Sequence, residues 1–344
     1  MSQDLRIAVV GAGMMGADHI RRITTAITGA TVSAVVEPDA ARRGAARRGA
    51  ALADAPGAQG FTDLDGALAS GLADAVLIAT PGQFHEEALL AVLAAGLPVL
   101  CEKPLTKEPE SSWRVVEAEM AGGKQLIQVG FMRRFDREYE QLRALIADRA
   151  AGELVMLHAR HRNASVPASY VQSMLINDSV VHEFDVVPWL AGGVVRSVEV
   201  KYPRRNSGAP ERLREPILVI MELDNGVLVD VEMNVSIGFG YQVSTEAVFE
   251  QGVARIGEPS GLQLFQAGRF AVAEHADYTT RFREAYDRQV QAWVDGARRG
   301  VVAGPSAFDG YKVAVCCAAG VEALDKEGPV TVDLPVTPAF YAER

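Results

Sequence analysis

A glycine-rich segment near the N-terminus constrains the fold of this chain more than any other feature. The segment GAGMMG, residues 11–16, directly follows an apolar, β-branched run from Leu5 to Val10 and directly precedes a helical pattern. Gly11 permits a tight turn, Gly13 lets the backbone approach another group closely, and Gly16 lets the helix pack against the strand. The spacing therefore predicts a strand, a turn and a helix at the start of a parallel α/β sheet.

The first half of the chain alternates short β-branched runs with longer Ala-rich amphipathic stretches, which is the pattern of βαβ units. Buried strands are expected at Leu5–Val10, Val32–Val36, Ala75–Ala79, Val99–Cys101 and Leu126–Val129. Helices are expected near Met14–Ile27, Phe84–Ala95 and Ser111–Ala121. Such a sheet is doubly wound.

After Gly152 the pattern changes to β-rich runs with few helices between them, which predicts a mostly antiparallel sheet. Its strands are expected at Glu153–Arg162, Ser197–Tyr202, Ile217–Leu223, Val227–Val235, Val243–Glu250 and Gly252–Ile256. The sequence Asp224-Asn225-Gly226 predicts a hairpin with a type I′ turn, because Asn and Gly tolerate a positive φ. Gln251-Gly252 is a second turn signal.

The length of 344 residues exceeds what one core usually organises, at roughly 100–200 residues per domain, so two domains are expected. We place the boundary at the short segment Arg149–Glu153, which gives domains over residues 1–150 and 151–344. The helical patterns Thr280–Arg299 and Ser306–Lys326 are free to pack back on the first domain. Val330–Leu334 is expected to return as a strand to either sheet.

Charge and cysteine content exclude several classes of protein. The formal net charge is −10 and no Lys/Arg block is longer than a pair, which argues against nucleic-acid binding, and Ala40–Ala53 is interpreted as a solvated helix face. Cys101, Cys316 and Cys317 form no CxxC and predict neither a disulfide framework nor a thiolate zinc site. We find no signal-peptide pattern and no apolar run near the ~18 residues of a membrane span. A cytoplasmic protein is expected.

The glycine segment has the context of a dinucleotide-binding loop, because the N-terminus of the following helix supplies amide donors and a favourable dipole for a pyrophosphate. Glu37, at the end of the second strand, lies 21 residues after Gly16, where a carboxylate accepts hydrogen bonds from the adenosine ribose. We expect NAD rather than NADP, because a 2′-phosphate would meet this charge and Arg42 and Arg43 lie a turn or more into the next helix. The alternative is an exposed strand-end carboxylate at Glu37, with Asp39 as the helix N-cap.

A lysine follows an apolar strand at Cys101-Glu102-Lys103-Pro104-Leu105. Lys103 should therefore lie at the carboxyl edge of the parallel sheet, where open α/β sheets bind their ligands. An ammonium there can hydrogen-bond a substrate hydroxyl and stabilise alkoxide character. The alternative is a surface lysine beside a turn. The sequence leaves the cis or trans state of the following proline bond open.

An acid and a histidine are spaced four residues apart in the segment Asn177–Asp185, which is expected to open a helix that runs to Leu190. Asp178 and His182 then share one helix face. Histidine can exchange a hydroxyl proton near neutral pH, and a carboxylate one turn away can orient it. The structural alternative makes Asp178 the helix N-cap and His182 a hydrogen-bonded core residue.

Other polar groups lie near the expected sheet edges. Arg133 and Arg134 follow Gly130-Phe131-Met132, and the run Arg-His-Arg-Asn at residues 160–163 ends a strand, so both could bind hydroxyls. No metal is expected: a zinc site would need His158, His161, Asp178 and His182, but no metal-ligand spacing such as HExxH occurs.

With these residues in place, the chain resembles the Gfo/Idh/MocA oxidoreductases, named for glucose-fructose oxidoreductase, inositol dehydrogenase and a rhizopine catabolism protein. The resemblance runs nearly end to end, and its most specific marker is Glu102-Lys103-Pro104. The markers are the GAGMMG loop, Ala79-Thr80-Pro81 with His85 downstream, residues 101–105, the helix start at 178–185 and Asp309-Gly310-Tyr311.

The resemblance implies a Rossmann domain followed by an open, mostly antiparallel sheet with helices on one face, and a homotetramer that packs sheet to sheet. The catalytic set would be Lys103, Asp178 and His182. The cofactor contacts would come from Gly11, Gly13, Met14, Met15, Glu37, Ala79, Thr80, His85, Glu102 and Lys103.

Within the family the chain is most similar to the inositol 2-dehydrogenases, through residues 130–136 (GFMRRFD), His161-Arg162-Asn163 and Gly240-Tyr241. The substrate contacts would then come from Arg133, Asn163, Ser179 and Tyr241. Gln242 departs from the acid that is usual after the tyrosine, and Ser179 takes a place where threonine or serine is usual.

The expected reaction is the NAD-dependent oxidation of a ring hydroxyl of a small polyol or sugar, and most specifically of myo-inositol to 2-keto-myo-inositol (scyllo-inosose). His182 would accept the proton, Asp178 would orient His182, and Lys103 would hold the oxygen. One alternative is a dehydrogenase of the same family that acts with NAD(P) on an aldose, another sugar or another inositol isomer. A second is a non-catalytic nicotinamide-binding regulator, which needs no proton acceptor.

Overall fold

The computed structural model describes residues 4–38, 57–259 and 261–342, and these form two compact units. The first unit contains Met1–Met132, Tyr286–Ala314 and Pro335–Arg344, and the second contains Arg133–Ala285 and Val315–Leu334. Asp39, Arg42, Arg43 and the predicted helix face at Ala40–Ala53 lie outside the described residues. The functional division at residue 150 remains a prediction.

The first unit contains six parallel strands in the order β3-β2-β1-β4-β5-β6. They are β1 (Leu5–Val10), β2 (Ala30–Val36), β3 (Gln59–Phe61), β4 (Ala75–Ile78), β5 (Val99–Cys101) and β6 (Ile127–Val129). The strand order reverses direction between β1 and β4, which is where open α/β sheets form a ligand crevice at their carboxyl edge. The predicted doubly wound sheet is confirmed.

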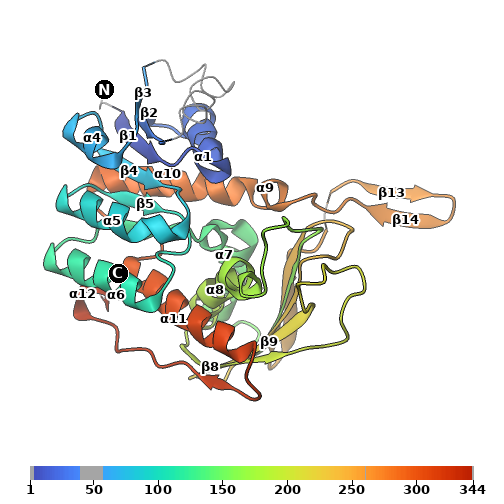
Figure 1. Cartoon of the computed structure of the whole chain (residues 1–344). Coiled ribbons are helices and arrows are strands. Elements are labelled where there is room, and N and C mark those ends of the chain that lie inside the picture. Colours follow the sequence, from blue (N-terminus) through green and yellow to red (C-terminus); the bar gives the residue numbers. More distant parts are fainter. Residues whose placement is uncertain (1–3, 39–56, 260, 343–344) are drawn as a thin grey trace. The chain divides into compact units, whose positions relative to one another are not determined.

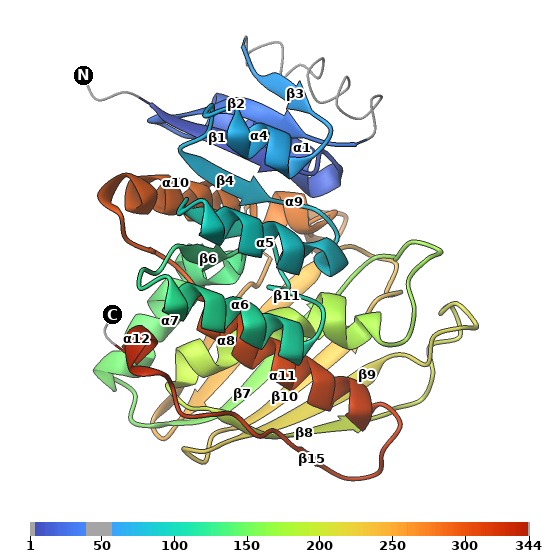
Figure 2. The same cartoon turned by 60° about the vertical axis from the view of Figure 1, so that its left-hand side comes forward.

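Helices from both ends of the chain accompany this sheet. They are α1 (Met14–Thr25), α4 (Leu64–Ala69), α5 (His85–Ala94), α6 (Pro109–Ala121), α10 (Arg283–Arg299) and the short α12 (Ala339–Ala342), whose Tyr341 bonds Glu119 of α6. Ile7 of β1 packs in one core with Ile20 of α1 and Trp293 of α10. Each such fully buried side chain contributes roughly 1.5–3 kcal/mol. α5 and α6 lie side by side (Figure 2).

The second unit contains a seven-stranded sheet in the order β12-β11-β7-β10-β9-β8-β15. Its strands are β7 (Leu154–Arg162), β8 (Val195–Lys201), β9 (Ile217–Leu223), β10 (Leu228–Asn234), β11 (Gln242–Phe249), β12 (Gly252–Ile256) and β15 (Val330–Thr331). Only the β7–β10 pair is parallel, so the mostly antiparallel sheet is confirmed. The last predicted strand therefore joins the second sheet, beside β8.

Two helices, α7 (Arg137–Asp148) and α8 (Val181–Ala191), cover one face of this sheet (Figure 1). Alternate residues of β7, such as Leu157 and His161, are buried, while those between them are only half-buried. The helix α11 (Ala307–Ala323) precedes β15 in the chain, and its C-terminal part belongs to this unit.

The hairpin between β9 and β10 forms as predicted, but its turn type is different. Gly226 has a φ of +85°, whereas Asn225 does not have a positive φ. A type I′ turn requires positive values at both positions, so this prediction was wrong. The Asn225 side chain instead donates from Nδ2 to the Ala191 carbonyl and accepts at Oδ1 from the Val227 backbone amide.

The helix predicted from Asn177 begins differently in the structure. Residues Leu175–Val180 form a π-helical turn, η3, and α8 follows from Val181, with Val180 as its N-cap. Asp178 is therefore not a helix N-cap, which excludes that half of the structural alternative; the burial of His182 agrees with the other half, a core histidine.

The structure contains a small hairpin that the sequence did not predict. Strands β13 (Gln263–Gln266) and β14 (Arg269–Val272) pair only with each other and extend away from the seven-stranded sheet of their unit (Figure 1). The short helix α9 (Tyr278–Arg281) follows. Phe265 and Phe270 contact each other with ring centroids 5.0 Å apart, and both are exposed.

Candidate active site

The glycine loop leaves open space where a dinucleotide would approach it. Gly11 has a φ of +90°, and a Cβ there would lie 2.9 Å from the Ala79 carbonyl oxygen. A Cβ at Gly16 would meet the Gly11 carbonyl oxygen, whereas a Cβ at Gly13 would meet no described atom within 4 Å. No side chain of the described residues caps the N-terminus of α1. This arrangement fits a pyrophosphate at the helix N-terminus.

Glu37 stands beside this loop at the end of β2 and is only 5% exposed. Its Oε2 accepts a hydrogen bond of 2.9 Å from the Ala12 amide. The alternative of an exposed strand-end carboxylate is therefore excluded. The carboxylate is next to the loop that would hold the pyrophosphate, as a ribose-binding acid requires.

The loops after β4 and β5 bring further predicted residues to the same carboxyl edge. The Thr80 Oγ1 atom is buried and has no hydrogen-bond partner among the described residues, so it is available to a ligand. Lys103 is half-buried, and the Lys103–Pro104 peptide bond is cis. His85 and Glu102 lie deeper, because both are buried and bond other protein groups. Met14 is 74% exposed at the start of α1.

In the second unit, Asp178, Ser179 and His182 follow one another through η3 and α8. Single π-helical turns occur frequently at functional sites. His182 is buried and Asp178 is exposed. Ser179 is also buried, and its hydroxyl lies 2.8 Å from the Tyr170 hydroxyl.

A buried ion pair lies next to His182. The Arg133 guanidinium bonds the Glu183 carboxylate, and both side chains are 1% exposed. His161 joins them, with its Nδ1 3.1 Å from Arg133 Nη2 and 3.4 Å from the Glu183 carboxylate. Ring centroids of His161 lie 6.3 Å from His182 and 6.0 Å from Tyr241. The second unit therefore places Arg133, His182 and Tyr241 around one histidine, His161.

Burial and charge act against each other in this cluster. Burial opposes ionisation of Glu183, but the charges of Arg133 and His161 outweigh it and hold the pKa of this carboxyl below its usual value. Burial also opposes the charge of Arg133, yet the Glu183 carboxylate raises the pKa of the guanidinium. The pair stays ionised. Burial raises the pKa of Tyr241, so its hydroxyl remains a hydrogen-bond donor.

Asn163 follows β7, the strand that carries His161. Its backbone amide donates to Asn234 over 2.8 Å and its carbonyl accepts from Ile237 over 3.1 Å. The side-chain Oδ1 is buried without a hydrogen-bond partner among the described residues. Such an acceptor suits a ligand hydroxyl.

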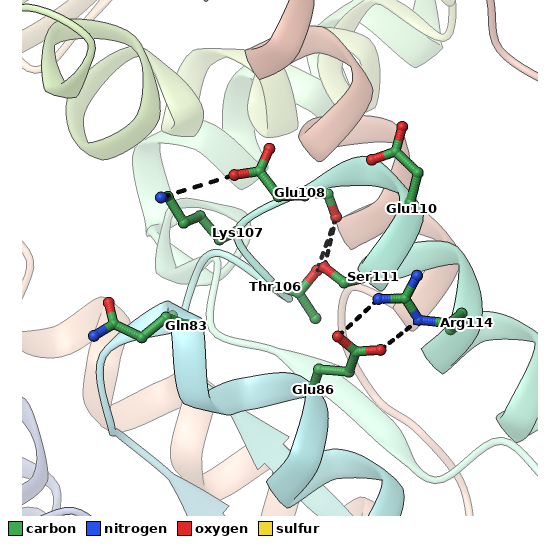
Figure 3. Close-up of a pocket in the computed structure, with 9 residues that line it drawn as sticks. Gln83, Glu86, Thr106, Lys107, Glu108, Glu110, Ser111 and Arg114 are labelled. Atoms are coloured by element: carbon green, nitrogen blue, oxygen red, sulfur yellow. Dashed lines mark hydrogen bonds and ion pairs between the residues drawn. The ribbon is translucent and has the colours of Figure 1, made fainter.

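A separate hollow of about 480 Å³ lies in the first unit, between the start of α5 and the start of α6 (Figure 3). Arg114 clamps the Glu86 carboxylate with bonds of 2.6 and 3.0 Å, and Thr106 bonds Ser111 (Figure 3). No predicted site residue lines this hollow. Because its polar groups bond one another, we assign it no part in the chemistry.

Comparison with known proteins places this chain in a family. Residues 5–131 match the Gfo/Idh/MocA model described as "Oxidoreductase family, NAD-binding Rossmann fold", and residues 139–255 match the GFO/IDH/MocA C-terminal domain. The chain belongs to the Gfo/Idh/MocA oxidoreductase family. This Gfo/Idh/MocA chain is 63% identical over 340 residues to inositol 2-dehydrogenase of Leifsonia xyli subsp. xyli, covering 98% of each. It is 62% identical to inositol 2-dehydrogenase of Corynebacterium glutamicum ATCC 13032, covering 99% of this chain and 100% of that one.

A solved structure is also similar over nearly the whole length. It is myo-inositol dehydrogenase from Lactobacillus casei in complex with NAD(H) and myo-inositol, with a TM-score of 0.95 and 31% identity. The match covers 98% of this Gfo/Idh/MocA chain and 100% of the other. Family membership confirms the resemblance found in the sequence, and the NAD-binding Rossmann fold confirms the expected type of cofactor.

Two residues of this family member were missed in the sequence. Glu183 was passed over because nothing in its spacing distinguishes it from any other helix carboxylate, although it directly follows His182. His19 was passed over on α1, because a histidine in a helical pattern usually has no special role. No group of three or more His, Cys, Asp or Glu in the described chain is placed to hold a metal ion. Within the same residues, no helix has the length and apolar character to cross a membrane.

Proposed function

We propose that this protein is an NAD-dependent inositol 2-dehydrogenase that oxidises myo-inositol to 2-keto-myo-inositol. The observation that carries the proposal is the 63% identity to an inositol 2-dehydrogenase over 98% of both chains. The likeness to the myo-inositol dehydrogenase of Lactobacillus casei supports it, since that structure holds NAD(H) and myo-inositol.

NAD is proposed to bind along the glycine loop of the first unit. The open space at Gly13 and the N-terminus of α1 would receive the pyrophosphate, and Glu37 would receive the adenosine ribose. When bound, the nicotinamide would take the hydride from the hydroxyl-bearing carbon. Glu37 favours NAD over NADP, because its carboxylate would repel a 2′-phosphate.

The proton is proposed to go to His182. A histidine has an acid-base range suited to this transfer near neutral pH. Asp178 would orient the His182 ring, and the Lys103 ammonium would hydrogen-bond the substrate oxygen and stabilise its developing negative charge. The chain's own residues thus bind, orient and deprotonate one hydroxyl.

The proposed substrate residues differ in how they could act. The Asn163 Oδ1 atom is the best placed to accept a bond from a ring hydroxyl, because no described group occupies it. Arg133 and Ser179 already bond Glu183 and Tyr170, so they would contribute mainly by fixing the side chains around the substrate. Tyr241 would act as a neutral donor.

The test is NADH formation with myo-inositol, scyllo-inositol, D-chiro-inositol, glucose and xylose, each with NAD and with NADP. We expect the largest kcat/KM with an inositol and NAD. Turnover of a sugar alone would identify a sugar as the substrate and leave the proposed reaction type unchanged. No turnover despite measurable NADH binding would favour the alternative of a non-catalytic nicotinamide-binding regulator.

We further propose a cytoplasmic homotetramer. The outer face of the second sheet supports this assembly, because it carries half-buried ion pairs such as Arg162–Glu232 beside exposed apolar residues such as Leu228. An antiparallel sheet can keep one face in water, and exposed apolar residues on such a face favour a contact with another protein surface. The partners would then be a small polyol and further copies of the chain.

A further inference from the structure

The turn that carries Lys103 is held on its first side by a buried histidine. His19, on α1, is 0% exposed, and its Nε2 lies 2.7 Å from Oε1 of Glu102. The other carboxylate oxygen of Glu102 accepts the backbone amide of Lys103 over 3.2 Å. One carboxylate therefore links the helix of the glycine loop to the backbone of Lys103.

The second side is held by another buried histidine. His85, at the start of α5, is 0% exposed; its Nδ1 lies 2.8 Å from the Pro104 carbonyl oxygen, and its Nε2 lies 2.7 Å from the Thr80 carbonyl oxygen. Carbonyl oxygens only accept, so His85 donates in at least one of these two contacts. The ring therefore ties the loop after β4 to the residue that follows Lys103.

The packing around the turn leaves little room for it to move. A Cβ at Gly130 would lie 3.1 Å from both Cα and Cδ of Glu102, and a Cβ at Gly310 would lie 2.7 Å from Cβ of Leu105. Two glycines thus allow other backbone to approach both ends of the turn closely. Lys103 is fixed in the backbone at the residue before it and at the residue after it.

We propose that His19 and His85 are positioning residues for Lys103, acting through the Glu102 carboxylate and the Pro104 carbonyl. This inference rests on the proposed function, in which the Lys103 ammonium holds the substrate oxygen. It gives Glu102 and His85 a different task from cofactor contact, because both are buried and their polar atoms are engaged by the protein. A displacement of about 1 Å at a catalytic group can cost about 100-fold in rate.

The first experiment compares His19→Leu with His19→Gln. The Gln amide can still donate to Glu102, whereas Leu cannot. We expect His19→Leu to lower kcat about 10- to 100-fold, with Kd for NADH changed less than about threefold, and His19→Gln to recover most of the loss. Arg21→Leu, on the exposed side of the same helix, is the control and should keep kcat within about twofold. Full activity of His19→Leu would overturn the proposal.

The second experiment repeats His19→Leu and His85→Leu in a Lys103→Met background. If the histidines act through Lys103, their substitution causes no further loss of kcat in this background. A loss as large as in the wild-type background would show that they act elsewhere, for example on the cofactor, and would overturn the proposal.

A third measurement does not depend on turnover. Acetic anhydride acetylates lysines of the cofactor-free protein, and peptide mass spectrometry gives the rate at Lys103 relative to the exposed Lys107. We expect at least about a threefold faster reaction at Lys103 in His19→Leu and His85→Leu, because a released turn exposes the amine. An unchanged rate would contradict the inference. If the wild type oxidises no polyol, the proposed function fails, but this rate still decides the positioning role.

Discussion

His182 owes its proposed role to its surroundings as much as to its own chemistry. It is buried next to His161, on the helix that also carries Glu183. We expect His182→Ala to lower kcat by about 100-fold or more, as for the loss of a positioned base, with Kd for NADH unchanged. Stopped-flow turnover and fluorescence titration measure the two quantities. Normal turnover with intact NADH binding would remove His182 from the mechanism.

The Arg133–Glu183 pair should make the free energy of unfolding depend on pH. The folded pKa of Glu183 is lowered, so the pair contributes stability above the unfolded pKa of about 4.3 and loses it as the pH falls through the folded pKa. Glu183→Gln should cost about 3–5 kcal/mol at neutral pH, because it leaves Arg133 buried beside a neutral group.

Urea unfolding from pH 7 down to about pH 3 measures this difference. The gap between wild type and Glu183→Gln should narrow in acid. Glu117→Gln, the same substitution at an exposed residue of α6, is the matched control. If the difference in unfolding free energy stayed constant over this range, the stabilising effect of Glu183 would not depend on its charge.

At the level of the element, two glycines of the β1–α1 turn have different roles: Gly13 leaves space for a ligand, and Gly16 allows close packing against the Gly11 backbone. Gly13→Ala adds a Cβ into open space, so we expect an unchanged Tm and a Kd for NADH raised at least about tenfold by the obstructed approach. Gly16→Ala drives a Cβ into the Gly11 carbonyl, so it should lower stability by about 1–3 kcal/mol. Differential scanning fluorimetry and NADH titration test both. Equal effects of the two variants on both quantities would refute this division.

At the scale of the whole molecule, the outer face of the second sheet is proposed to join copies of the chain. Leu228, the first residue of the central strand β10, lies on this face beside Met156 and is 37% exposed. Leu228→Lys should convert the tetramer to smaller species in light scattering after size exclusion, because a charge would be buried in the contact. Val336→Lys, at a position 92% exposed in the first unit, should leave the tetramer intact. A tetramer that survives Leu228→Lys would exclude this face.

The sequence alone was sufficient to predict the two sheets and most of their strands. Periodicity and glycine spacing are local signals, and β1, β5, β9 and β12 have the predicted bounds. The glycine loop and the strand-end position of Lys103 follow from the same signals. The four-residue spacing supplied Asp178 and His182 as candidates, and the family resemblance implied their catalytic roles, which stay predictions.

The tertiary structure decided which polar groups are available and which are already engaged. A sequence shows that Glu102, His85 and Arg133 are polar, but only the fold shows that each is buried and bonded to another protein group. Their partners lie far away in the chain, as with His19 and Glu102, 83 positions apart. The physical reason is that desolvation and hydrogen-bond pairing depend on neighbours in space, whereas periodicity depends only on neighbours in the chain.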